Sequence, residues 1–216
     1  MKRTILALVA LSSLFLVLTP AFGSNVPANQ VTVANLWTTL GSNPLGGYTA
    51  VSPLDSGAFT LPAKNPSTGF YETQVFAQSD GDLVFAYYVS LDSAPPNPTS
   101  GDVQKISTGD WDSSITVDAA EYNEGGATAA SGINRIGGVI TMYFQSPTVK
   151  PGNFSYVLLL YTNATKWDTD TIGIQDGAGT TVAGFVPLAP TPEPATLSLL
   201  GAGLVGLGTL RKKLRK

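Results

Sequence analysis

The sequence of 216 residues contains no cysteine and no histidine. Without cysteine, the chain has no disulfide bond, no thiol nucleophile and no thiolate ligand for a metal. Without histidine, it lacks the commonest general base and the commonest ligand of transition metals. The two absences exclude Ser-His-Asp hydrolases and the zinc sites that are built on histidine or cysteine.

Charged residues are also scarce, at 12% of the chain against 43% hydrophobic residues. The formal net charge of −3 is an average over unlike segments, because residues 24–191 contain 14 acidic and 5 basic side chains, a net charge of −9. An acidic body disfavours polyanionic partners such as nucleic acid or an anionic membrane surface. We therefore predict no nucleic-acid partner and a body suited to secretion.

The first 23 residues have the pattern of a secretory signal peptide. Lys2 and Arg3 precede an apolar run from Ile5 to Leu18. Ala21 and Gly23 then place small residues at the −3 and −1 positions, so we predict cleavage after Gly23. The alternative is an uncleaved membrane anchor, for which an apolar run of 14 residues is short.

A second apolar segment, residues 195–210, follows a proline-rich linker at residues 187–194. As a helix its 16 residues would be about 24 Å long, against roughly 30 Å for the hydrocarbon core of a bilayer. We predict a short transmembrane helix here. A basic cluster follows it, made of Arg211, Lys212, Lys213, Arg215 and Lys216. Because basic residues stay in the cytoplasm, residues 24–186 are expected on the outer side of the membrane.

Pro192, Glu193 and Pro194 stand directly before this apolar segment. These three residues, the glycine-rich apolar stretch and the basic cluster together resemble the PEP-CTERM sorting signal of Gram-negative bacteria, over residues 191–216. The resemblance implies an exosortase, an integral-membrane processing enzyme, as a partner. It also implies a transient stay in the inner membrane, followed by delivery to the cell surface or extracellular matrix. The alternative is an ordinary C-terminal anchor that contains the three residues by coincidence.

The residues between the two ends predict an all-β domain. In residues 83–91, apolar side chains alternate with a period of two, and the Asp80-Gly81 pair before them is typical of a hairpin turn. Asp176-Gly177 later in the chain predicts a second hairpin turn. Residues 156–161 are apolar at every position, which indicates a strand covered on both faces. Further strands are expected at residues 70–78, 115–118, 139–145, 154–162, 171–175 and 181–186. We predict a single antiparallel β-sandwich over residues 24–186, with a jelly roll as one arrangement that fits.

Three aspartate pairs with one intervening residue are candidates for a calcium site. They are Asp80 and Asp82, Asp110 and Asp112, and Asp168 and Asp170. Alternate carboxylates in a loop can converge on Ca²⁺, which takes about six to eight oxygen ligands. None of the pairs matches an EF-hand loop, and aspartate is also a common turn residue. Calcium is the one cofactor that the sequence suggests, with turn formation as the alternative.

Aromatic residues beside acids and amides are typical of carbohydrate-binding surfaces. The candidates here are Trp37, Trp111, Trp167, Tyr48 and Tyr122. Trp111 and Trp167 adjoin aspartates in expected loops, so we predict that these two contact a ligand. The alternative is that the aromatic residues belong to the core, because each buries a large apolar area.

Catalysis by a pair of carboxylates, as in glycoside hydrolysis, is the remaining route to an enzyme. The glutamates of the body are Glu72, Glu121 and Glu124, and we expect the last two on a solvated loop around Tyr122. Any of 14 acids could pair, so we predict no catalytic residue. The leading hypothesis is a non-enzymatic surface or matrix protein with a structural or adhesive role in a biofilm or exopolysaccharide. The alternatives are a carbohydrate-binding module and a carboxylate-based glycoside hydrolase.

Overall fold

A computed structural model describes residues 24–25, 30–34, 38–62, 66–92, 101–123, 128–145 and 147–189. The signal peptide predicted for residues 1–23 lies outside these residues. So do the Pro-Glu-Pro motif, the apolar segment and the basic cluster, which all follow residue 190. Within the described ranges, no helix is long and apolar enough to cross a membrane.

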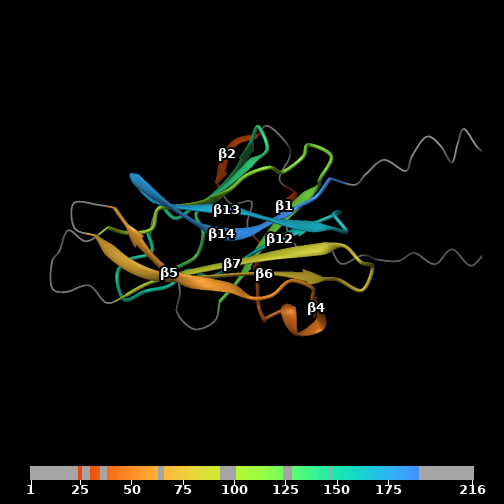
Figure 1. Cartoon of the computed structure of the whole chain (residues 1–216), viewed down its shortest axis with the longest axis horizontal. Coiled ribbons are helices and arrows are strands. Elements are labelled where there is room, and N and C mark those ends of the chain that lie inside the picture. Colours follow the sequence, from red (N-terminus) through yellow and green to blue (C-terminus); the bar gives the residue numbers. More distant parts are fainter. Residues whose placement is uncertain are drawn as a thin grey trace, which may run out of the picture.

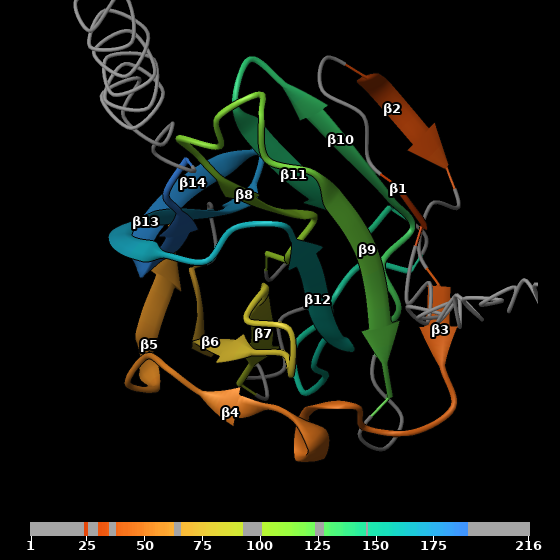
Figure 2. The same cartoon turned by 90° about the vertical axis from the view of Figure 1, so that its right-hand side faces the viewer.

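The strands form two sheets that pack face to face (Figures 1 and 2). Sheet A contains, in spatial order, β1 (Ser24–Asn25), β9 (Val117–Tyr122), β12 (Val157–Thr162), β7 (Leu83–Leu91), β6 (Ser67–Ala77) and β4 (Thr49–Ala50). In addition, β3 (Thr38–Leu40) pairs with β9, and β5 (Asp55–Leu61) pairs with β6.

Sheet B contains, in spatial order, β14 (Ala178–Pro187), β13 (Trp167–Asp176), β8 (Lys105–Thr108), β11 (Val139–Tyr143), β10 (Gly132–Ile136) and β2 (Gln30–Ala34). The pairs between these named strands are antiparallel in both sheets, apart from the short parallel pair of β3 and β9. The prediction of an antiparallel β-sandwich is confirmed.

Turn residues place two hairpins where the sequence predicts them. Between β6 and β7, Gly81 has a φ of 93°, and the Asp82 N–H donates to Asp80 Oδ1 at 3.1 Å. Between β13 and β14, Gly177 has a φ of 67°. Glycine adopts these positive φ angles without the steric penalty that other residues meet.

Strand boundaries differ from the predictions where the local pattern is weak. The strand expected at residues 115–118 is β9, which starts at Val117 and continues to Tyr122. Its last residues pair with β12 on one side and with β3 on the other, and neither partner is close in sequence. Strands β5, β8 and β10 were not predicted, because they are short or polar and gain their order from long-range pairing.

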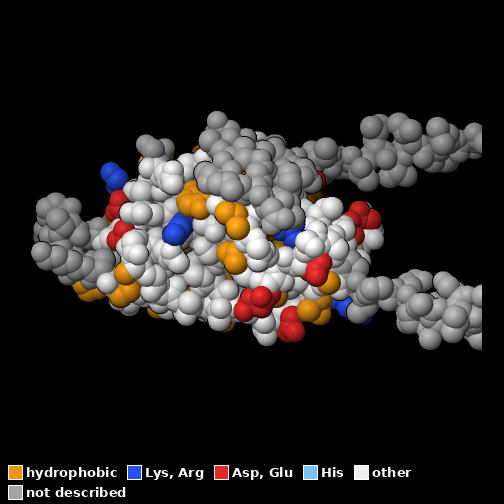
Figure 3. All heavy atoms as spheres, turned by 90° about the horizontal axis from the view of Figure 1, so that it is seen from above, with side chains coloured by type: hydrophobic (Ala, Val, Ile, Leu, Met, Phe, Trp, Pro, Cys, Tyr) orange, Lys and Arg blue, Asp and Glu red, His pale blue; other side chains and the backbone are white. Residues whose placement is uncertain are grey.

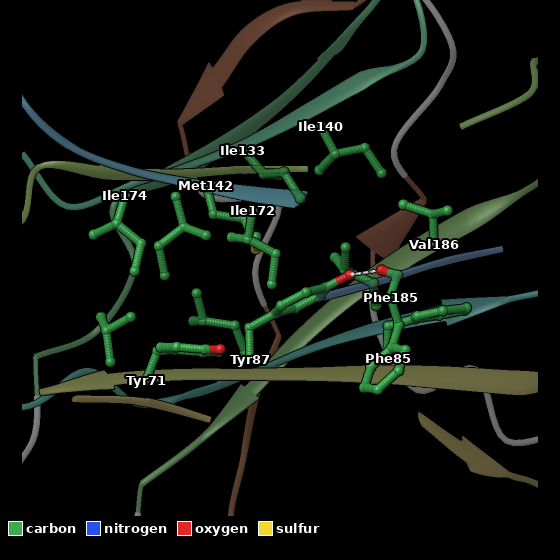
Figure 4. Close-up of a cluster of buried hydrophobic side chains, with 14 of the residues drawn as sticks. Tyr71, Phe85, Tyr87, Ile133, Ile140, Met142, Ile172, Ile174, Phe185 and Val186 are labelled. Carbon is green, nitrogen blue, oxygen red and sulfur yellow. Dashed lines mark hydrogen bonds between the residues drawn. The ribbon is translucent and has the colours of Figure 1, made fainter. Parts of the chain in front are cut away.

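Apolar side chains from both sheets fill the space between them. Phe85 of sheet A and Ile133, Ile140 and Met142 of sheet B are completely buried there (Figure 4). Leu158 of sheet A is also completely buried in this core. Burial of this core is the main favourable contribution to folding.

A second apolar cluster covers the opposite, outer face of sheet A. We call it the outer cluster; it contains Val84, Ala86, Ala120, Tyr122, Val157, Leu159 and Tyr161. Residues 40–54, which we call the strap, cross this face, and Leu40, Leu45 and Tyr48 pack on the cluster (Figure 2). Every residue of β12 is therefore buried, which confirms that this strand is covered on both faces.

A tyrosine of sheet A reaches the backbone of β14, the outermost strand of sheet B. The Tyr87 hydroxyl donates to the Phe185 carbonyl oxygen at 3.2 Å, across the core (Figure 4). Burial raises the pKa of Tyr87 well above its ordinary value, so the hydroxyl keeps its proton and remains a donor. The last four residues of β14, including Phe185, Val186 and Pro187, are buried, so the end of this strand is packed into the domain.

Candidate functional site

The structure places the Trp111 side chain in the core, so its prediction as a ligand-contacting residue is wrong. Its side chain is 1% exposed. The indole Nε1 donates to Thr108 Oγ1 at 3.2 Å, and the ring packs edge-on against Phe85 with centroids 5.4 Å apart. A ring enclosed in this way cannot stack on a ligand from solvent.

A buried arginine explains why the loop around Trp111 folds inward. Arg135 of β10 is 2% exposed, and its guanidinium donates to the carbonyl oxygens of Trp111, Asp112 and Ile115. The Trp111 N–H also donates to the Gly138 carbonyl at 2.8 Å. Desolvation lowers the pKa of Arg135, while the nearby Asp112 carboxylate opposes that effect. No local pattern in the sequence signals this long-range anchor.

The other predicted aromatic residues lie in separate places. Trp167 begins β13 in sheet B and packs edge-on against Phe185, with centroids 5.0 Å apart. Tyr48 and Tyr122 lie on the outer side of sheet A, where Tyr48 packs edge-on against Tyr161. Trp37 lies outside the described residues. The structure does not combine these residues into one platform.

The three aspartate pairs do not form one cluster, although Asp170 of the third pair lies beside Gly109, next to the second pair. They lie in the β6–β7 turn, in the loop between β8 and β9, and at the start of β13. Asp112 Oδ1 accepts from the Ser114 N–H at 2.8 Å, and Asp168 Oδ1 accepts from the Thr169 N–H at 2.7 Å. In the described part of the chain, no three acidic side chains come together as a metal site would require. The contacts of Asp80, Asp112 and Asp168 are those of residues that stabilise their own backbone.

Glu121 is buried, so its expected position on a solvated loop is wrong. It lies in β9 on the same face as Val117 and Ala119, which points toward sheet B, and it is 2% exposed. Its Oε2 accepts from the Ala130 N–H at 2.8 Å, and its Oε1 accepts from Thr39 Oγ1 at 3.2 Å. Burial raises the pKa of Glu121, and the two hydrogen bonds oppose that shift. Glu124 lies outside the described residues.

A groove of about 410 Å³ lies on the outer face of sheet A, beside the strap. Outward-facing side chains of β6 and β7 form most of it, together with Tyr122 and Val157. Leu45 and Leu54 of the strap complete the lining. Ala86 of β7 is the smallest of the lining residues. The groove exists because the strap covers one part of this sheet face and leaves the adjoining part open.

Aromatic and polar side chains share this groove. Its rings are Phe70, Phe76, Tyr88 and Tyr122, and its outward-facing polar side chains are Glu72, Gln74 and Ser90. Thr73 and Tyr87 are also lining residues. Thr73 and Tyr87 belong to the inward-facing set of their strands, so their side chains face the core. Gln74 Nε2 donates to the Ser52 carbonyl at 3.3 Å, which ties the strap to β6.

The sequence shows only part of this arrangement. The period of two predicts that Phe70, Glu72 and Gln74 share one face of their strand, but it does not say which face. The same holds for Ala86, Tyr88 and Ser90, because β7 is apolar at both parities. The position of the strap depends on contacts with residues that are distant in sequence, and no short motif predicts these contacts.

The opposite side of the molecule is different. Figure 3 shows that face with acidic and basic side chains scattered among uncharged ones, and with small groups of hydrophobic side chains. A hollow of about 330 Å³ on sheet B is lined by Lys105, Tyr143, Phe144 and three polar residues, Gln104, Gln145 and Thr148. The aromatic groove of sheet A is therefore the stronger candidate for a binding site.

Comparison with known proteins identifies one segment of the chain. A family model described as the PEP-CTERM protein-sorting motif matches residues 190–213. No curated protein and no solved structure matches the chain. The match confirms the resemblance seen in the Pro-Glu-Pro motif, the apolar stretch and the basic residues, and it does not extend to the β-sandwich.

Proposed function

The chain carries a PEP-CTERM protein-sorting motif, and from this premise we propose that it is a non-enzymatic surface or matrix protein with an adhesive or structural role. The motif implies export, a transient membrane-anchored state and processing by exosortase, a membrane enzyme. The β-sandwich is then the part of the protein that acts at the surface. The position of the motif directly after this domain is the observation on which the proposal rests.

The short distance between the domain and the motif supports delivery of a folded body. Strand β14 ends at Pro187, and Pro192 follows five residues later. Five residues reach at most about 18 Å when fully extended. An enzyme that reads the motif therefore works close to a domain whose last strand is already packed by Phe185 and Val186.

The contacts of the buried carboxyl group support a non-enzymatic role. Glu121 receives its hydrogen bonds from a backbone N–H and a threonine hydroxyl of its own domain. A general acid or base needs a carboxyl group within hydrogen-bond reach of a substrate. Among the described residues of the groove there is one acidic side chain, Glu72, whereas glycoside hydrolysis uses two that flank the scissile bond.

Peptide mass mapping tests the sorting step. In cells with exosortase, we expect the protein in the surface or matrix fraction, without peptides from residues 195–210. In cells without the enzyme, these peptides should remain and the protein should stay in the membrane fraction. Alanine substitution of Pro192, Glu193 and Pro194 together should reproduce that retention, and Leu188→Ala is the matched control, because it changes an exposed neighbour of the motif. Equal recovery of the peptides from both strains would contradict the proposed sorting.

A cell-adhesion assay tests the role of the body separately. Cells that lack the protein should lose cohesion in their matrix, and wild-type protein should restore it. The variant with three alanines should not, because it stays in the membrane. Unchanged cohesion in the deletion strain would refute the adhesive role and leave the sorting result intact.

A further inference from the structure

We infer that the groove on the outer face of sheet A binds a segment of an uncharged polysaccharide. This inference deepens the proposed adhesive function and rests on it. It gives that function a site, between the strap and the β6–β7 hairpin, and a chemical class of ligand.

The β6–β7 register places an aromatic ring beside a polar group on neighbouring strands. Glu72 lies opposite Tyr88, and Phe70 lies opposite Ser90. Side chains in such cross-strand pairs are about 5 Å apart at their Cβ atoms. A sugar ring has apolar C–H faces and a rim of hydroxyl groups, so it needs a flat apolar surface with hydrogen-bonding groups next to it. These two pairs provide an aromatic surface and a hydrogen-bonding group close enough together to contact the same sugar ring.

Two rings at the open part of the groove are the surfaces on which a sugar would stack. Phe70 is 39% exposed, so its ring is open to solvent. Tyr88 is half-buried, and its ring lies 6.0 Å from that of Phe154 at an angle of 42°. This contact holds Tyr88 in place before a ligand arrives, which lowers the entropy cost of binding.

The charge of the lining selects against acidic sugars. Among the described residues that line the groove, Glu72 is the one charged group, and it is a carboxylate. A uronic acid or sulfated sugar would bring a second negative charge close to it, and the described lining contains no lysine or arginine to compensate. The hydroxyl groups of a neutral sugar can instead donate charge-assisted hydrogen bonds to Glu72.

The pairing of the strands disfavours an extended peptide as the occupant. A peptide that binds by strand addition needs a free edge with unpaired backbone groups. Under the groove, β7 is paired with β6 and β12, and β6 is paired with β5 and β4 on its other side. Between these two short strands, Val75 bonds to Val51 and Ser52 of the strap. A ligand of this groove must therefore be recognised by side chains.

Isothermal titration of the full-length protein in detergent tests the inference. The probes are cellohexaose, maltohexaose and a mannohexaose as neutral chains, and a galacturonic acid hexamer as the charged chain. We expect at least one neutral chain to bind and the charged chain not to bind. Phe70→Ala should weaken neutral binding by about tenfold, because it removes one stacking surface. Ile136→Ala is the matched control, since Ile136 is an exposed apolar residue in a strand of sheet B.

Glu72→Gln tests the selection by charge. The variant keeps the size of the side chain and removes its negative charge. The difference in affinity between the neutral chains and the galacturonic acid hexamer should therefore become smaller. Absence of binding to all three neutral chains would overturn the inference. Preferential binding of the charged chain, or equal losses in Phe70→Ala and Ile136→Ala, would also overturn it.

The outcomes separate this inference from the proposed function. If the protein is sorted correctly and supports cohesion but binds no glycan, the groove site is refuted and the adhesive role stands. If the protein binds a glycan but is not processed at its motif, the proposed processing by exosortase is refuted and the groove site stands.

Discussion

Replacement of Trp111 by alanine should destabilise the β-sandwich strongly. The ring is enclosed in the core, packs against Phe85 and hydrogen-bonds to Thr108. Truncation of a buried tryptophan to alanine typically costs about 3–5 kcal/mol of unfolding free energy. Because domains have only about 5–15 kcal/mol of stability, this loss is a large fraction of the total.

Thermal unfolding measures this loss directly. For a domain of this size, 1 kcal/mol corresponds to about 2–4 °C in Tm, so Trp111→Ala should lower Tm by roughly 6–20 °C. Trp111→Phe should lower Tm by much less, because it keeps an aromatic ring against Phe85. Trp167→Ala is the second comparison, since Trp167 is half-buried and should fall between the two.

The same variants decide between a core residue and a ligand contact. If Trp111 lies in the core, glycan affinity in the Trp111→Phe variant should equal that of the wild type. If Trp111→Ala left Tm unchanged and abolished binding of a neutral hexasaccharide, the side chain would have to be exposed. That result would refute the reasoning.

Three further substitutions test individual contacts. Thr73 Oγ1 is buried and makes no hydrogen bond within the described residues, so Thr73→Val should stabilise the protein by about 1 kcal/mol in urea unfolding; a loss of stability would contradict this. Burial raises the pKa of Glu121 above its ordinary 4.5, so its favourable contribution is complete below pH 4.5 and is lost as the pH rises through the folded-state pKa. The unfolding free energy of Glu121→Gln, measured in urea, should therefore rise relative to that of wild type from pH 4 to pH 7. A difference between the two proteins that does not change with pH would refute the raised pKa of Glu121. A Cβ atom at Gly69 would collide with the Ser90 carbonyl oxygen and lie 2.6 Å from Phe59, so Gly69→Ala should cost about 2 kcal/mol or more; Gly46→Ala, with open space around it, should leave Tm nearly unchanged.

Several strands could be predicted from the sequence because their signals are local. The alternation in residues 83–91 and the two Asp-Gly turns depend on neighbours along the chain. The continuous apolar run of β12 indicates burial on both faces whatever covers them. The polar strands β5 and β8 were not predicted, because their local sequences carry no clear strand pattern and they are held in place by pairing with other strands.

The candidate site could not be predicted in the same way. An aspartate beside Trp111 indicates a loop correctly, but the loop turns inward because Arg135, 24 residues away, binds its carbonyl oxygens. Glu121 has the sequence context of a solvated loop, and its burial follows from pairing of β9 with β12 and β3. In both cases the exposed fraction depends on partners that the local sequence does not contain.

The sorting motif could be identified from the sequence alone, because residues 190–213 form one contiguous segment. The all-β fold of residues 24–186 could also be predicted, because the alternation of side chains along a strand is visible in neighbouring residues. Which side chains are available to a partner depends on contacts between residues that are distant in sequence. Arg135 holds the loop of Trp111 inward, and the pairing of β9 with β12 and β3 buries Glu121. On the outer face of sheet A, the strap leaves Phe70 exposed in the groove.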